Sequence, residues 1–305
     1  MSADLESLLD VAPEEETALL AGAAPVARTQ WQLFRRRFFR HRLAMFGLLI
    51  LVVMCVCTFG ASWVAPYPNT PDLLADAVGP SRKHWFGVDL VGRDYLTTCL
   101  YAGKISLKIG LFVSVLSTIL GTLTGAIAGY FGKAADQVLM RVTDLFLLLP
   151  GLAVLAVALK LLGGQDWTII LVLAGLGWMG IARIVRGQVL SLKEKEFVEA
   201  AKSIGCSNTR IILRHIVPNL VGPIMVNASL SVAGAIIAES TLSYLGFGVQ
   251  PPKTSWGKLL ADGKETIATK AYLLYFPGLL IILVTLAVNF LGDGLRDATD
   301  PQAKH

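Results

Sequence analysis

Six long apolar runs follow one another from residue 43 onward, and the shorter segments between them hold most of the charged residues. A helix needs about 20 mostly apolar residues to cross the hydrocarbon core of a membrane. The ten-residue alternating segments typical of membrane β-barrels are not found. The pattern therefore predicts an all-α membrane protein with six transmembrane helices, at Leu43–Ala65, Ile109–Gly132, Val142–Leu162, Trp167–Ala182, Asn219–Phe247 and Ala271–Gly292.

The composition agrees with this assignment. Hydrophobic residues make up 54% of the 305 residues and charged residues only 16%, against about 25% charged in soluble domains. The N-terminal residues are different, because six acidic residues precede the first basic one, whereas a secretory signal starts basic and continues apolar. We expect an acidic, disordered cytoplasmic tail at 1–30 and one membrane domain at 31–302.

Orientation is predicted from the basic residues of the connecting segments, which are enriched on the cytoplasmic side of membranes. With a cytoplasmic N-terminus, the inner segments hold roughly twice as many lysine and arginine residues as the outer ones. Both termini are therefore expected in the cytoplasm. Contact with anionic lipid headgroups accounts for the net charge of +5 without nucleic-acid binding.

A short charged segment, EFVEAAKSIG, lies between the fourth and fifth predicted spans, on the cytoplasmic side. As a helix, it places Phe197, Ala200, Ala201 and Ile204 on one face, by their i, i+3, i+4, i+7 spacing. Gly205 is expected to end this helix, and Ser207 to cap a second short helix that stops at Pro218. Periodicity alone leaves two alternatives open: a helix lying in the headgroup layer, or a knob that docks on another protein.

Motifs that carry catalysis are missing from the chain. The four histidines form no H-E-x-x-H pair, and no G-x-S-x-G or G-x-x-x-x-G-K-[ST] sequence occurs. Cys55 and Cys57 point away from each other on a helix, and the four cysteines are expected to be free thiols. We therefore predict no catalytic, cofactor-binding or metal site, and any ATP used must be bound by another subunit.

The EAA segment resembles the cytoplasmic loop of ABC importer permeases, with Glu199-Ala200-Ala201, Gly205 and Pro218 at the matching spacing. His215 and Val217 replace the isoleucine and leucine of the general pattern, as in the peptide-importer branch. Three further stretches are similar to dipeptide and oligopeptide permeases of the C type: HWFGVDLVGRDYLTTCLYAGKISLKIG, STLSYLGFGVQPPKTSWGKLL and LGDGLRDATDPQ. The resemblance runs from about Trp31 to Gln302.

The resemblance implies a type I ABC importer permease fold in a bacterial inner membrane. It also implies four partners: a B-type permease, two ATPase subunits that bind ATP and Mg²⁺, and an external substrate-binding protein. The loop at 183–218 is expected to couple to an ATPase. Its contact residues are then Glu199, Ala200, Ala201, Gly205 and Pro218, with the apolar face bracing the helix on its own membrane domain.

Other residues have candidate roles. Glu239, inside the fifth span, is expected either to line a translocation path or gate, or to be buried against a neighbouring helix. The resemblance places an outer loop near the binding protein, with Asp89, Arg93, Asp94 and Trp256 as candidate contacts. Arg141 and Asp144 are expected to pair on one helical face. A glycine stripe, GTLTGAIAG, predicts close helix packing, with the partner permease as one candidate.

Two alternative functions remain. Related permeases also carry nickel or other metal chelates, and the external binding protein usually sets selectivity. An ion-coupled secondary transporter is less well supported, since Glu239 is a lone candidate carboxylate and the two halves of the chain do not repeat. The leading prediction is the permease subunit of a peptide importer.

Overall fold

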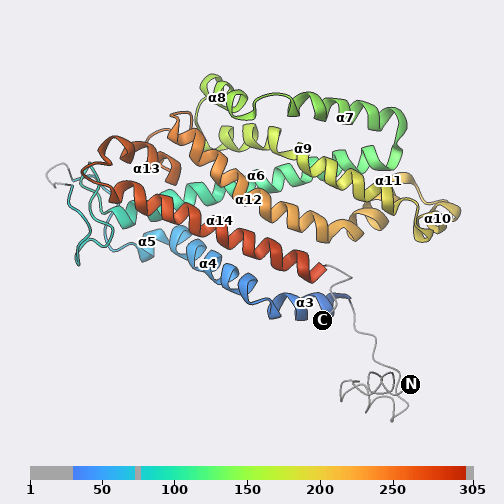
Figure 1. Ribbon diagram of the computed structural model, residues 1–305, viewed down its shortest axis with the longest axis horizontal. Coiled ribbons are helices and arrows are strands. Elements are labelled where there is room, and N and C mark those ends of the chain that lie inside the picture. Colours follow the sequence, from blue (N-terminus) through green and yellow to red (C-terminus); the bar gives the residue numbers. More distant parts are fainter. Residues whose placement is uncertain (1–29, 73–76, 300–305) are drawn as a thin grey trace, which may run out of the picture.

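A computed structural model describes residues 30–72 and 77–299, and the described residues form helices without a named strand. The predicted acidic tail lies outside this part of the chain, apart from its last residue. Long helices run side by side in an elongated bundle (Figure 1). Five of them are long and apolar enough to cross a membrane: α4 (Arg42–Phe59), α6 (Tyr95–Phe131), α9 (Asp166–Leu192), α12 (Val221–Tyr244, continuous with the turns before it from Asn208) and α14 (Tyr272–Thr299).

The third predicted span is wrong as a single helix. Its residues belong to α7 (Lys133–Leu147) and α8 (Gly151–Leu162), whose axes differ in direction by 84°. Pro150 lies at the break, where it has no N–H to donate and disfavours helical geometry in the preceding residue. A hydropathy pattern runs through this proline without interruption. The described chain thus has five candidate spans, or six if the bent pair counts as one.

Helices α6 and α9 are both longer than predicted. Helix α6 starts at Tyr95, where the Asp94 carboxylate accepts a hydrogen bond from the Thr97 N–H at 2.8 Å. Lys104 and Lys108 interrupt the apolar run but not the helix, and Lys108 is paired with Asp166 at the start of α9. Helix α9 likewise continues past Arg183 and Arg186 to Leu192.

The glycine stripe of α6 packs against α9 of the same chain, so the partner permease is not needed to explain it. A Cβ atom added to Gly121 would lie 2.7 Å from the Trp178 carbonyl oxygen, and one at Gly129 would lie 2.9 Å from the Arg186 carbonyl oxygen. At Gly125, which lies between them, it would overlap the Ala182 carbonyl oxygen. Close backbone approach therefore holds the two helices together along two turns.

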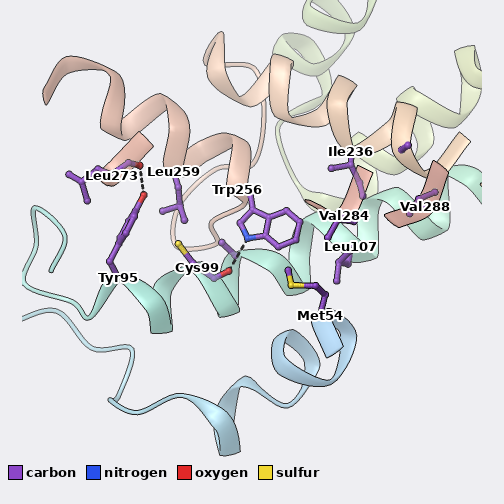
Figure 2. Packing of buried hydrophobic residues seen from close by; sticks show 12 residues of the cluster. Met54, Tyr95, Cys99, Leu107, Ile236, Trp256, Leu259, Leu273, Val284 and Val288 are labelled. Carbon is purple, nitrogen blue, oxygen red and sulfur yellow. Dashed lines mark hydrogen bonds between the residues drawn. The ribbon is translucent and has the colours of Figure 1, made fainter. Parts of the chain in front are cut away.

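The remaining elements are short. They are α3 (Gln30–Arg40), α5 (Ala61–Val64), α10 (Glu196–Ser203), α11 (Asn208–Ile211), the π-helical turn η1 (Ile212–Ile216), the 3₁₀ turns η2 (Val217–Leu220) and η3 (Lys264–Thr266), and α13 (Trp256–Gly263). Helices α10 and α13 lie at opposite ends of the bundle (Figure 1). At the start of α13, Trp256 is fully buried beside α6 and donates its indole N–H to the Cys99 carbonyl at 2.9 Å (Figure 2).

Candidate functional site

The loop between α9 and α12 is a compact, hydrogen-bonded structure. Gly205 has a φ of +77° and ends α10: its N–H donates to the Lys202 carbonyl, and the Cys206 N–H donates to the Ala201 carbonyl. This pair of bonds is a Schellman cap, which needs a residue with positive φ. Ser207 occupies the N-cap position of α11, although its side chain makes no capping hydrogen bond. The predicted turn at Gly205 is therefore present.

The predicted inward face of α10 is wrong for three of its four residues. Val198 and Ala201 are buried in an apolar cluster that includes residues of α9, α11, η1 and η2, whereas Phe197, Ala200 and Ile204 are exposed, Ile204 by 80%. The apolar sector of α10 is wider than the surface of the membrane domain that packs against it. One half of the sector packs on the membrane domain, and the other half forms an open apolar stripe.

Glu199 is also on the surface of the loop. Its side chain has no hydrogen bond or ion pair with any residue in 30–72 or 77–299, while its carbonyl accepts a bond from the Ser203 hydroxyl at 3.0 Å. Pro218 is exposed in η2. The loop is tied to the end of α6, where the Tyr130 hydroxyl donates to Asn208 Oδ1 at 2.9 Å.

Ion pairs between α7 and α9 form the base of the loop. Arg186 Nη2 donates to Asp136 Oδ2 at 2.6 Å, and its Nε donates to the other carboxylate oxygen. The predicted pair of Arg141 with Asp144 is wrong, because Asp144 binds Arg183 of α9 instead. Contacts between residues about forty to fifty positions apart could not be found from helical spacing alone.

Glu239 is fully buried in α12 and lies at the centre of a hydrogen-bond network. Its Oε1 accepts from the hydroxyls of Ser243 and Ser255, both at 2.7 Å, and its Oε2 lies 3.5 Å from the Ser106 hydroxyl. The hydroxyl oxygen of each serine also accepts a hydrogen bond from a backbone N–H group within residues 249–258. Ser243 accepts from Val249, Ser106 from Trp256 and Ser255 from Lys258. The carboxyl group thus connects α6, α12 and the start of α13.

A second anchor holds the same segment. Asp166, buried at the start of α9, binds Lys108 of α6 at 2.7 Å and Lys253 at 2.8 Å. Lys108 also lies over the Trp167 ring, 4.5 Å from its centre. The segment between α12 and α13 is therefore fixed at two nearby points, at Lys253 through Asp166 and at Ser255 through Glu239.

A cavity of about 520 Å³ opens between α8, α9 and α12. Its walls are apolar or small, with glycines on all three helices, and Asn227 and Ser231 are its polar residues. Glu239 does not line it, so the geometry fits the alternative in which this acid is buried between helices. The cavity residues carry no charge and form no motif, which is why the sequence did not reveal them.

Three of the four predicted contact residues in the outer loop are buried: Asp89, Asp94 and Trp256. Asp89 holds its own turn by accepting from the Val91 and Arg93 N–H groups at 3.0 and 2.8 Å and pairing with the Arg93 guanidinium. Asp94 caps α6 and binds His84 Nδ1 at 2.9 Å. These side chains stabilise the loop, and only that of Arg93 is partly exposed.

Comparison with known families gives a direct match. Residues 121–305 match the model described as binding-protein-dependent transport system inner membrane component, and residues 29–80 match the N-terminal TM domain of oligopeptide transport permease C. The chain belongs to this family of inner membrane components. It is therefore a multi-pass inner-membrane permease of an ABC importer, as the EAA loop and the apolar spans predicted.

Curated relatives of the permease cover nearly its whole length. It is 41% identical to the oligopeptide transport system permease protein OppC of Haemophilus influenzae over 90% of this chain and 89% of that protein. It is 39% identical to the glutathione transport system permease protein GsiD of Escherichia coli O6:K15:H31 over 91% and 92%. The inward-facing MetNI methionine ABC transporter shares the fold, with a TM-score of 0.56, 14% identity and coverage of 68% of this chain and 98% of that one.

Proposed function

We propose that this permease forms half of the translocation path of an ATP-driven, binding-protein-dependent importer of dipeptides or oligopeptides. The observation that carries the coupling part of the proposal is the open apolar stripe of Phe197, Ala200 and Ile204 on α10, next to the unpaired Glu199. An exposed apolar stripe on a capped, rigid helix suits a protein partner that buries it. The partner is a separate ATPase, which binds ATP and Mg²⁺.

The assembly we propose has a second, B-type permease, two ATPases and an external binding protein. In this arrangement the domain at 31–302 has both termini in the cytoplasm, as the excess of basic residues in the inner segments favours. The loop at 183–218 is then cytoplasmic, with Ala201 and Gly205 shaping it and Pro218 near its end. The cavity between α8, α9 and α12 is the side of the path that this subunit contributes.

Changing Ile204 to Asp is expected to weaken ATPase binding at least tenfold, because a charge replaces an apolar side chain that the partner must bury. The measurement is co-purification of the ATPases with the membrane complex in mild detergent, together with ATPase activity stimulated by loaded binding protein. Glu199→Arg and Gly205→Pro should show the same loss. The matched control is Ile267→Asp, at a 48% exposed isoleucine near α13. If the ATPases co-purify with the Ile204→Asp variant as fully as with the native chain, the coupling role is contradicted. An equal loss of co-purified ATPase in the Ile267→Asp control contradicts it as well.

The peptide assignment is supported by the two relatives, whose names refer to oligopeptide and glutathione transport. Uptake of labelled dipeptides, longer peptides and a nickel chelate by cells that express the whole system distinguishes the two substrate classes. Saturable uptake of peptide, lost when the permease is deleted, supports the proposal. Uptake of the nickel chelate alone overturns the peptide assignment and leaves the importer assignment intact.

A further inference from the structure

Helix α3 and the first residue of α4 carry five arginines within eight positions: Arg35, Arg36, Arg37, Arg40 and Arg42. No acidic residue occurs between positions 30 and 71 to neutralise them locally. Arg35, Arg36 and Arg40 are exposed, and they form no ion pair with any residue in 30–72 or 77–299. This is a strongly positive surface that the coupling loop and the cavity do not use.

The position of this surface along the bundle is fixed by α4. From Leu43 to Phe59 this span has no charge, and Leu43, Phe46 and Leu49 are each more than half exposed, as expected for side chains facing acyl chains. The arginines precede the span by one to two helical turns. Their guanidinium groups therefore lie at the depth of the lipid headgroups, where clusters of four to eight basic residues recognise anionic lipids.

An exposed aromatic ring lies within the arginine surface. Phe39 is 58% exposed, and it follows Arg35 by four positions and Arg36 by three, which places all three side chains on one side of α3. The half-buried rings of Phe34 and Phe38 are stacked on each other, 6.0 Å apart, and α3 contacts α14. One side of α3 thus packs on the protein, while the other presents basic groups around an apolar ring.

The joint between α3 and α4 is held in place by His41. Its Nδ1 accepts the Ala44 N–H at 3.0 Å, so its Nε2 carries the proton and faces the Asp297 carboxylate of α14 at 3.3 Å. Because both ring nitrogens have partners, the angle at which α3 leaves α4 is fixed. The arginines are presented by an ordered helix.

We propose that Arg35, Arg36 and Arg40, together with Phe39, form a binding site for an anionic phospholipid. The guanidinium groups bind the phosphate, for which their fork of donors is suited. The Phe39 ring lies against the upper part of an acyl chain. A free phosphate ion has no apolar part that could contact the Phe39 ring. The position of these residues beside the membrane span α4 also favours a lipid.

The test is a lipid titration of the purified full chain in detergent, followed by native mass spectrometry. The probes are phosphatidylglycerol, phosphatidylcholine and inorganic phosphate. We expect phosphatidylglycerol to bind more tightly than phosphatidylcholine and to stay bound in excess phosphate. Replacing all three arginines by glutamine should lower phosphatidylglycerol affinity on the order of a hundredfold, at about fivefold for each basic residue. Phe39→Ser should weaken the binding of phosphatidylglycerol and leave the binding of inorganic phosphate unchanged.

The matched control removes three exposed basic groups from the region around the start of α6, as Arg82→Gln, Lys83→Gln and Lys104→Gln. It should bind phosphatidylglycerol as the native chain does. Thermal unfolding verifies that both triple variants are folded. Native affinity in the α3 variant, an equal loss in the control, or displacement of the lipid by phosphate each overturns the proposal.

Discussion

Replacing Glu239 with alanine is expected to release the segment between α12 and α13 and to lower the free energy of unfolding by about 4 kcal/mol. Two buried hydroxyls, those of Ser243 and Ser255, would lose the acceptor of their 2.7 Å hydrogen bonds, and each donor left without a partner costs about 2 kcal/mol. The Ser106 contact at 3.5 Å adds little. Thermal unfolding in detergent measures the stability loss, and hydrogen–deuterium exchange should show faster exchange of the Val249, Trp256 and Lys258 amides.

Two variants serve as controls for this result. Glu239→Gln keeps one carbonyl oxygen that both short hydrogen bonds can use, and it should lose less than half as much stability as the alanine variant. Glu265→Ala removes an exposed acid just after α13 and should behave as the native protein does. If Glu239→Ala leaves amide exchange around residues 249–258 unchanged, the carboxyl group does not hold the segment.

A leucine at Gly125 is expected to separate α6 from α9 and to cost about 3 kcal/mol or prevent folding altogether. The glycine faces the Ala182 carbonyl and the Val185 side chain so closely that even a methyl group has no room. Overpacking of this kind usually costs 1–3 kcal/mol, and here backbone rather than a flexible side chain has to move, which argues for about the upper value. The measurements are the yield of folded protein after extraction in mild detergent and the thermal unfolding of that protein.

Gly187 of α9 is the matched position, since nothing lies within 4 Å of a Cβ atom added there. Gly187→Ala should be neutral or stabilise the protein by up to about 1 kcal/mol through helix propensity. Gly125→Ala should lie between the two. Equal stability of the Gly125 and Gly187 variants is incompatible with close packing of α6 on α9.

The hydropathy pattern predicted the order of the apolar segments because membrane burial acts on each segment separately. It misplaced the start of α6, since the charges at Lys104 and Lys108 ended the apolar run while a partner, Asp166, lay fifty-eight positions away. It also passed through Pro150, where backbone geometry and not hydropathy decides the structure.

The candidate site was predictable where a local rule governs it. The turn at Gly205 follows from the positive φ that a Schellman cap requires. The face on which α10 packs does not follow from a local rule, because eight residues with a broad apolar sector are compatible with burial of either side. Ser243 lies four positions after Glu239 in the same helix, so helical spacing indicates this contact. The other two partners, Ser106 and Ser255, come from α6 and the start of α13, and spacing along the chain contains no information about them.

Helix α6 joins the two ends of the molecule in one piece. At 37 residues it is about 55 Å long, with the Asp94 cap at one end and the Tyr130 hydroxyl bound to Asn208 at the other. Because α9 is packed against it without room for sliding, the two helices can tilt together but can hardly bend apart. We therefore expect a displacement of the loop beside α10 to move the far end of α6, beneath Trp256, without a relay of side chains.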